Sequence, residues 1–293
     1  MDQKTASIFS PCLLYLCLVA FLPGCMNHLF YKPDQVIYQP SGPHEDVFFR
    51  TADGVKLHGQ FFPAVRDEFG TVIHFHGNYG NISYSLKQTD WLPGEGFNVF
   101  TFDYRGYGKS DGVPSRRGLY SDSIAAIEYV ISRTDIDTEN LFIFGQSLGG
   151  ANAIAAIGKN NFSGIRAVAI EGVFSSYRQE ARDMMTAEVR KNIGNVPCLS
   201  LQLWPVSFLM ITDELSPLDF IGLIAPIPVL VIHGTEDDKV LYYHAREIYK
   251  KAGEPKYLWT VSNGHLTTFT GGVFSDAYRK KLVEFFKKYR TFE

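Results

Sequence analysis

The chain has 293 residues, of which 45% are hydrophobic and 20% charged, and this supplies enough apolar material for the core of one large globular domain. The formal net charge is -3, so no excess of positive charge favours a nucleic acid as partner. The sequence has no internal repeat and no low-complexity segment, which excludes the solenoid and disordered classes.

The amino terminus, residues 1–25, differs from the rest of the chain. An apolar run from Ile8 to Leu22 follows Lys4; it is short for a transmembrane helix and typical of a signal-peptide core. The run ends in Leu-Pro-Gly-Cys, which resembles a bacterial lipobox. That resemblance implies lipidation of Cys25, export to the cell envelope and attachment to a membrane. An uncleaved signal anchor and secretion are the alternatives.

Residues 26–45 contain three prolines and are predicted to form a tether that holds the following domain, residues 46–293, off the membrane. Once the signal peptide has left and Cys25 carries lipid, only Cys198 remains as a thiol. A disulfide framework is therefore excluded, and the fold must depend on its core.

The domain is predicted to open with a hairpin, because the turn residues 51–54 (Thr-Ala-Asp-Gly) join two extended runs. Further strands are predicted at residues 71–76, 98–103, 141–144, 167–170, 228–233 and 257–261, and helices at 81–92, 115–133, from 150 onward, 239–252 and 274–289. Continuous apolar strands that alternate with helices are typical of a mostly parallel sheet with helices on both faces. The fold class is therefore α/β, and a ligand is expected beyond the carboxyl ends of the strands.

Residues 172–226 interrupt this alternation and are predicted to form a small helical cap over the carboxyl edge of the sheet. The apolar part of this cap contains Trp204 and Phe208. These two side chains either line an acyl pocket or only pack the cap onto the body, and the sequence leaves both possibilities open.

The chemistry is expected at Gly145-Gln146-Ser147-Leu148-Gly149, which lies between an apolar strand and a helix of small residues. A G-x-S-x-G sequence in this context is a nucleophile elbow, a turn so sharp that it needs glycine on both sides. The turn would raise the Ser147 hydroxyl above the end of the strand and place the amino terminus of the next helix beneath it.

A serine hydroxyl needs a base to take its proton, and the base needs a carboxylate that orients it. His265 is the candidate base, because it lies in a loop after the last predicted strand. Asp237 follows the preceding strand and is the candidate acid, with Asp238 and Glu236 as alternatives. His233 and His244 are less suited, since they fall at a strand end and within a helical stretch.

Two backbone N–H groups are needed to bind the oxyanion of the intermediate. We expect them from Leu148 and from Asn78, with Tyr79 as second choice for the latter; Tyr79 is also expected to border the substrate pocket. His74 and His76 share one face of a strand, but no third ligand accompanies them. No metal and no cofactor are therefore predicted.

Five motifs occur in order: HGNYGN (76–81), FDYRGYGKSDG (102–112), GQSLGG (145–150), HGTEDDKV (233–240) and NGH (263–265). Together they resemble the α/β-hydrolase superfamily over residues 47–290, in particular the branch of serine aminopeptidase-like hydrolases and of the α/β-hydrolase-domain proteins of types 13 and 17. The resemblance implies that fold, and it places the acid four residues after the histidine of HGTxD, at Asp237. This chain departs from the pattern at Tyr79, where a small residue is usual.

These observations predict a serine hydrolase that cleaves an ester or thioester through a Ser147–His265–Asp237 triad and a covalent acyl-enzyme. Its expected partners are a small-molecule or lipid acyl substrate and a membrane, reached through the N-terminal lipid anchor. A peptidase or an acyltransferase on the same scaffold is an alternative. A non-catalytic lipoprotein that binds a lipid or a partner is another.

Overall fold

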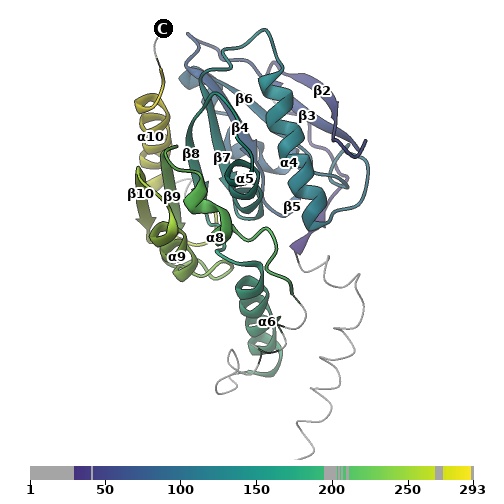
Figure 1. Ribbon diagram of the computed structural model, residues 1–293, viewed down its shortest axis with the longest axis vertical. Helices are drawn as coiled ribbons and strands as arrows, with labels where there is room; N and C mark the ends of the chain where they lie inside the picture. Colours follow the sequence, from purple (N-terminus) through teal and green to yellow (C-terminus); the bar gives the residue numbers. More distant parts are fainter. Residues whose placement is uncertain are drawn as a thin grey trace, which may run out of the picture.

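The computed structural model describes residues 30–40, 42–194, 203, 205, 207–208, 211–267 and 273–291. Its centre is an eight-stranded sheet in the order β10-β9-β8-β7-β4-β6-β3-β2, with helices on both faces (Figure 1). The strands β2 and β3 pair antiparallel, as do β3 and β6, and the other neighbours are parallel. The predicted α/β class and mostly parallel sheet are confirmed.

The strands are β1 (Lys32–Pro33), β2 (Glu45–Arg50), β3 (Lys56–Phe62), β4 (Gly70–Phe75), β5 (Tyr79–Gly80), β6 (Phe97–Phe102), β7 (Leu141–Gln146), β8 (Ile165–Glu171), β9 (Val229–Gly234) and β10 (Lys256–Val261). The helices are α3 (Ile82–Ser85), η1 (Leu86–Gln88), η2 (Leu92–Glu95), α4 (Arg116–Ile131), α5 (Leu148–Lys159), α6 (Tyr177–Ile193), α8 (Pro217–Phe220), η3 (Ile221–Leu223), α9 (Tyr243–Lys251) and α10 (Val273–Lys288).

The core is divided by the sheet into two apolar layers. Alternate residues of β4 enter opposite layers: Ile73 packs with the layer of α4, α5 and α9, while Val72 packs with the layer of α10. The residues of β4, β6 and β7 are buried throughout. This explains why these strands read as continuous apolar runs, since both of their faces are covered.

The predicted helix over residues 81–92 is wrong in its length. The chain forms α3 and then the short 3-10 turn η1, and a second 3-10 turn, η2, follows Trp91. Asn81 caps α3 by accepting the N–H of Ser83. At the other end, η1 ends at Gln88, and the N–H groups of Thr89 and Asp90 both donate to the carbonyl of Leu86, a shared acceptor that is common at helix ends.

The segment predicted as a cap, residues 172–226, is divided in two. Helix α6 projects from the end of the molecule at which β5 lies (Figure 1). By contrast, α8 packs on α5, so closely that a Cβ added at Gly158 would lie 2.8 Å from the Cβ of Phe220. The described part of the insertion therefore consists of a projecting helix and a return segment that belongs to the body.

The described part of the predicted tether lies on the domain. The side chains of Phe30 and Tyr31 are buried in the core, and β1 pairs in parallel with β5. The ring of Phe30 lies 5.2 Å from that of Tyr177 and 6.2 Å from that of Phe174. From Phe30 to Pro40 the chain is part of the folded body, and Cys25 lies outside the described residues.

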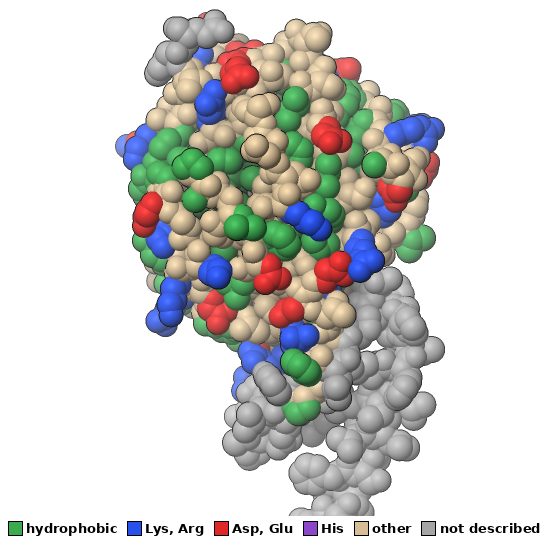
Figure 2. Space-filling view, in the orientation of Figure 1, with side chains coloured by type: hydrophobic (Ala, Val, Ile, Leu, Met, Phe, Trp, Pro, Cys, Tyr) green, Lys and Arg blue, Asp and Glu red, His purple; other side chains and the backbone are tan. Residues whose placement is uncertain are grey.

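Within the part of the chain that the structure describes, no helix has both the length and the apolar character needed to cross a membrane. On the face shown in Figure 2, acidic and basic side chains are intermixed and do not gather into a field of one sign. This distribution agrees with the small net charge and gives no support to a polyanionic partner.

We expect Phe30→Ala to destabilise the domain by about 2–4 kcal/mol, because the change removes a buried ring from a cluster of aromatic side chains. Unfolding in urea would measure the change. Val65→Ala is the matched control, because Val65 is 75% exposed and should change the free energy of unfolding by less than about 0.5 kcal/mol. Equal stability of wild type and Phe30→Ala would show that residues near 30 are not part of the cooperative fold.

Candidate active site

The turn from β7 to α5 holds Ser147 in a strained conformation. Its backbone has φ 51° and ψ -122°, a combination that residues with a side chain rarely adopt. The N–H of Ser147 donates to the carbonyl of Glu171 at 2.8 Å, and this bond fixes the turn to the end of β8. The predicted elbow is present: α5 begins at the residue directly after the serine, two positions earlier than expected.

Close packing explains the glycines of the turn. A Cβ added at Gly145 would lie 2.6 Å from the Cα of Gly150. A Cβ at Gly149 would collide with the carbonyl oxygens of Phe75 and His76 at the end of β4. The amino terminus of α5 is thus pressed against the neighbouring strand, which only a residue without a side chain allows.

The histidine and the acid predicted from the sequence are in contact. The Nδ1 of His265 lies 2.7 Å from the Oδ2 of Asp237, the distance of a charge-assisted hydrogen bond. The Asp237 side chain is 1% exposed, and its other oxygen, Oδ1, accepts the N–H groups of Lys239 and Val240 at 2.9 Å each. A donor at Nδ1 leaves Nε2 of His265 as the basic nitrogen.

The other acids considered for this role do not contact the histidine in the described structure. The side chain of Asp238 is 76% exposed and pairs with Lys239 at 3.5 Å, and Glu236 is exposed. Beneath Asp237 lies His233, which is buried and whose Nε2 donates to the carbonyl of Val240 at 2.8 Å. Burial lowers the pKa of His233, so that this ring is neutral at pH 7 and supports the acid loop from below.

The loop of His265 comes close to the serine turn. The side chain of Leu266 lies between the two loops, near Gly77. A Cβ added at Gly77 would lie 4.0 Å from Cδ1 of Leu266 and 3.7 Å from the Cβ of Ser147. At Gly172, next to the residue that holds Ser147, an added Cβ would lie 3.1 Å from Cε1 of His265. Among the described residues no hydrogen bond joins Ser147 to His265, and such bonds commonly form only when a substrate is bound.

Of the two residues expected to supply the oxyanion N–H groups, Leu148 directly follows the serine, and Asn78 follows Gly77, whose added Cβ would lie 3.7 Å from the Cβ of Ser147. Leu148 is the first residue of α5, where backbone N–H groups have no partner within the helix. Asn78 follows β4, and its carbonyl is held by the N–H of Lys32 and the hydroxyl of Tyr107, both at 3.0 Å. These two bonds fix the peptide on the carbonyl side of Asn78 and so the loop that carries its N–H.

The predicted pocket residues lie apart from one another. Tyr79 is exposed in β5, with its ring 5.5 Å from that of Tyr84. Phe208 is half-exposed beneath the guanidinium of Arg178, which lies 4.4 Å from the ring, and it borders a cavity of about 230 Å³ beside α6. Trp204 lies outside the described residues. Within these residues no cluster of His, Cys, Asp or Glu has the arrangement of a metal site.

The loop after β6 is held by buried charges. Arg105 donates to Asp122 at 2.9 Å and to Asp53 at 2.8 Å, so its guanidinium braces this loop. The carboxylate of Asp103 lies 3.0 Å from Nδ1 of His58 and accepts the N–H of Ile82 at 2.9 Å. This carboxylate therefore ties β3, β6 and the segment after the Asn78 loop together.

A second buried polar cluster joins α6 to α9, and sequence reasoning missed it. Nδ1 of His244 lies 2.7 Å from Oγ of Ser175, and its Nε2 lies 3.4 Å from the carboxylates of Glu180 and Asp183. The Ser175 hydroxyl also donates to Glu247 at 2.6 Å. Burial alone would lower the pKa of His244, but the two carboxylates outweigh it and raise this pKa.

Comparison with known proteins agrees with this geometry. A family model described as "Serine aminopeptidase, S33" matches residues 66–198. Over 256 residues the chain is 34% identical to the alpha/beta hydrolase domain-containing protein WAV2 of Arabidopsis thaliana, covering 84% of this chain and 79% of that protein. The chain belongs to the α/β-hydrolase superfamily. The predicted superfamily is therefore confirmed. The family model that matches residues 66–198 is the one for the predicted serine aminopeptidase-like branch.

Two further matches extend this result. The chain is 38% identical over 283 residues to the protein YfhR of Escherichia coli O157:H7, covering 93% of each. Among solved structures, an esterase of Pyrococcus furiosus, Pf2001, superimposes with a TM-score of 0.70 at 23% identity, covering 89% of this chain and 98% of that one. The similarity to Pf2001 shows a shared fold. Together with the family, the comparisons support a hydrolase.

The raised pKa of His244 has a consequence for stability. The folded pKa of His244 exceeds its ordinary value of about 6.5. The charged ring therefore contributes its full stability below pH 6.5, and this contribution is lost as pH rises through the folded pKa. The difference in the free energy of unfolding between wild type and His244→Gln should therefore shrink as pH rises from 6.5 to 9. Urea unfolding at several pH values would measure it, and a constant difference would contradict the assignment.

Proposed function

We propose that this chain is a serine hydrolase that cleaves an ester or a thioester through a covalent acyl-enzyme. The observation that carries the proposal is the 2.7 Å contact of His265 with Asp237, in a loop that packs beside the strained turn of Ser147. A nucleophile, a base and an orienting carboxylate come from three separate loops at one edge of the sheet, in the order that this superfamily uses.

In the first half of the reaction, Nε2 of His265 takes the proton of the Ser147 hydroxyl while Oγ attacks the carbonyl carbon. The carbonyl oxygen becomes an oxyanion, which the N–H groups of Leu148 and Asn78 stabilise. The bond to the leaving group then breaks, and His265 gives its proton to the departing alcohol or thiol. Throughout this half, Asp237 stabilises the imidazolium and keeps Nδ1 protonated.

In the second half, His265 removes a proton from water, and the hydroxide so formed attacks the acyl-enzyme. Collapse of this second oxyanion releases the acid, and the proton on His265 returns to Ser147. The fold sets this chemistry, while the side chains above the site select the acyl and leaving groups. Tyr79, in β5, and Phe208, beside the cavity next to α6, are the described candidates for that selection. Trp204 is a third candidate, proposed from the sequence alone.

We further propose that the enzyme acts at a membrane of the cell envelope. The lipobox-like ending at Cys25 and the apolar run before it support this location. In this arrangement Cys25 carries the lipid, and only the four residues 26–29 separate it from the buried Phe30.

Ser147→Ala should abolish hydrolysis of chromogenic esters, lowering kcat by about 10⁴-fold or more, because no other group can form the acyl-enzyme. A chain-length series of such esters would measure it, and a fluorophosphonate should label the wild type but not the variant. Ser132→Ala, an exposed serine at the end of α4, is the control that should keep full activity. Failure of the wild type to react with either probe would overturn the proposal. Cleavage of aminoacyl amides alone would identify a peptidase.

Asp237→Asn should lower kcat for the same esters by about 10³–10⁴-fold, because an amide at this position no longer favours a proton on Nδ1 of His265. Asp238→Asn is the matched control, since the neighbouring carboxylate is exposed and pairs only with Lys239 in the described structure. A larger loss in Asp238→Asn than in Asp237→Asn would contradict this assignment and identify Asp238 as the acid.

A further inference from the structure

The described chain begins at the carboxyl edge of the sheet, where the proposed site lies. The N–H of Lys32 donates to the carbonyl of Asn78, and the N–H of Gly108 donates to the carbonyl of Asp34. Residues 30–34 thus cross the loops that follow β4 and β6. In Figure 1 the start of β1 and the projecting helix α6 lie at the same lower end of the molecule. Phe30, where the described chain begins, therefore lies on the body beside the site.

The length of that segment limits how the domain can be oriented. From Cys25 to Phe30 an extended chain spans at most roughly 18 Å. From Leu22, the end of the apolar run, the reach is roughly 28 Å. A domain of this size is roughly 45 Å across. Whether the anchor is a lipid on Cys25 or the apolar run itself, the segment is too short to pass around the body, so the edge at which it enters must face the membrane.

The surface beside this entry point has the composition of a membrane interface. We name it the entry patch and define it by the four side chains Val36, Tyr38, Tyr79 and Tyr84. Val36, Tyr38 and Tyr79 are 55%, 53% and 61% exposed. The ring of Tyr84 lies 5.0 Å from that of Tyr38 and 5.5 Å from that of Tyr79, so the three tyrosines form one continuous surface.

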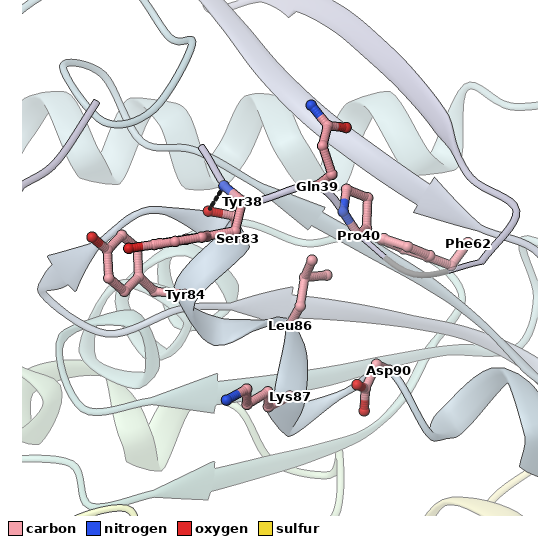
Figure 3. A pocket seen from close by; sticks show the side chains of 9 residues that line it. All are labelled: Tyr38, Gln39, Pro40, Phe62, Ser83, Tyr84, Leu86, Lys87 and Asp90. Atoms are coloured by element: carbon pink, nitrogen blue, oxygen red, sulfur yellow. Dashed lines mark hydrogen bonds between the residues drawn. The ribbon is translucent and has the colours of Figure 1, made fainter. Parts of the chain in front are cut away.

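The entry patch continues into a hollow of about 420 Å³, shown in Figure 3. Tyr38, Pro40 and Phe62 border it together with the first turns after β5, and Lys87 and Asp90 lie at its rim. Lys32 is exposed on the other side of the patch. Tyrosine rings with lysines at their margin are favoured at the level of lipid headgroups, where the ring is partly apolar and the ammonium meets phosphate.

We propose that the entry patch docks on the bilayer that holds the N-terminal segment, and that the site takes its acyl substrate from that bilayer. The membrane source of the substrate rests on the proposed function, because it assigns a substrate class, an ester embedded in the membrane, to the Ser147 site. Val113 and Leu241, in the loops after β6 and β9, add exposed apolar side chains to the same edge. Docking brings the proposed oxyanion loop, next to Tyr79, to the level of the ester groups of the lipid.

The first test is independent of activity. The full chain is reconstituted into vesicles of phosphatidylcholine and phosphatidylglycerol (3:1) that contain a phosphatidylcholine with a diazirine near its ester group. After irradiation, labelled peptides are identified by mass spectrometry. Labels should concentrate on residues 34–40 and 79–87 and spare 63–69 and 221–226, at the opposite edge. Ser147→Ala should give the same pattern, and labels spread evenly or centred on the opposite edge would overturn the proposal.

The second test compares two substrates. Val36→Asp/Tyr38→Asp should lower hydrolysis of a long-chain ester embedded in these vesicles by about tenfold or more, because charge is unfavourable at the interface. The same variant should hydrolyse a dissolved short-chain ester at the wild-type rate. Val65→Asp/Leu223→Asp is the matched control, because these side chains are 75% and 63% exposed at the opposite edge; it should change neither rate.

The results separate the two proposals. Labelling of the entry patch without turnover of either ester would support the docking surface and overturn ester hydrolysis at the Ser147 site. If the wild type hydrolyses the dissolved ester, the hydrolase is supported. If, in addition, the two double variants lose hydrolysis of the embedded ester to the same extent, docking through the entry patch is overturned.

Discussion

The close approach of α5 to β4 is the constraint on which the site depends. Because Gly149 lies against the carbonyl oxygens of Phe75 and His76, the helix begins directly beside the strand, and the connecting turn must be as sharp as the one observed. The bond from the N–H of Ser147 to Glu171 fixes that turn from the other side. The serine is therefore held by backbone contacts with two neighbouring strands, and its position does not depend on the conformation of any long side chain.

The acid and the histidine are positioned by different means. Asp237 accepts two N–H groups of its own loop, and neutral His233 supports that loop from inside the sheet. His265 is aligned by Asp237, and the next residue, Leu266, spans the space between Gly77 and Gly172. One apolar side chain thus fills the space between the loop proposed to bind the oxyanion and the glycine beside the histidine ring, so packing as well as the hydrogen bond places the loop of His265.

The parts that could be predicted from sequence are those with a local signature. The elbow pentapeptide lies between a strand and a helix, and the buried strands are long apolar runs, so their order and type follow from residues that are adjacent in the chain. The contact of His265 with Asp237 was expected because each follows a strand of one parallel sheet. The His244 cluster has no such signature, because its partners come from α6 and α9, some 60 residues apart. The helix expected after residue 81 was overestimated, because apolar spacing does not reveal that Thr89 and Asp90 both bond to one carbonyl.

The insertion that carries α6 is closed at its base. Asp213 accepts the hydroxyls of Ser176 and Ser216 at 2.7 Å each, and the N–H of Leu218 donates to the carbonyl of Ser175 at 3.1 Å. The two ends of the insertion are thereby joined where it leaves the body. The hydrogen bonds at this base do not involve the segment between the two ends. The base is therefore a natural place for exchange of the segment beyond it, because the hydrogen bonds that close it are made by residues outside that segment.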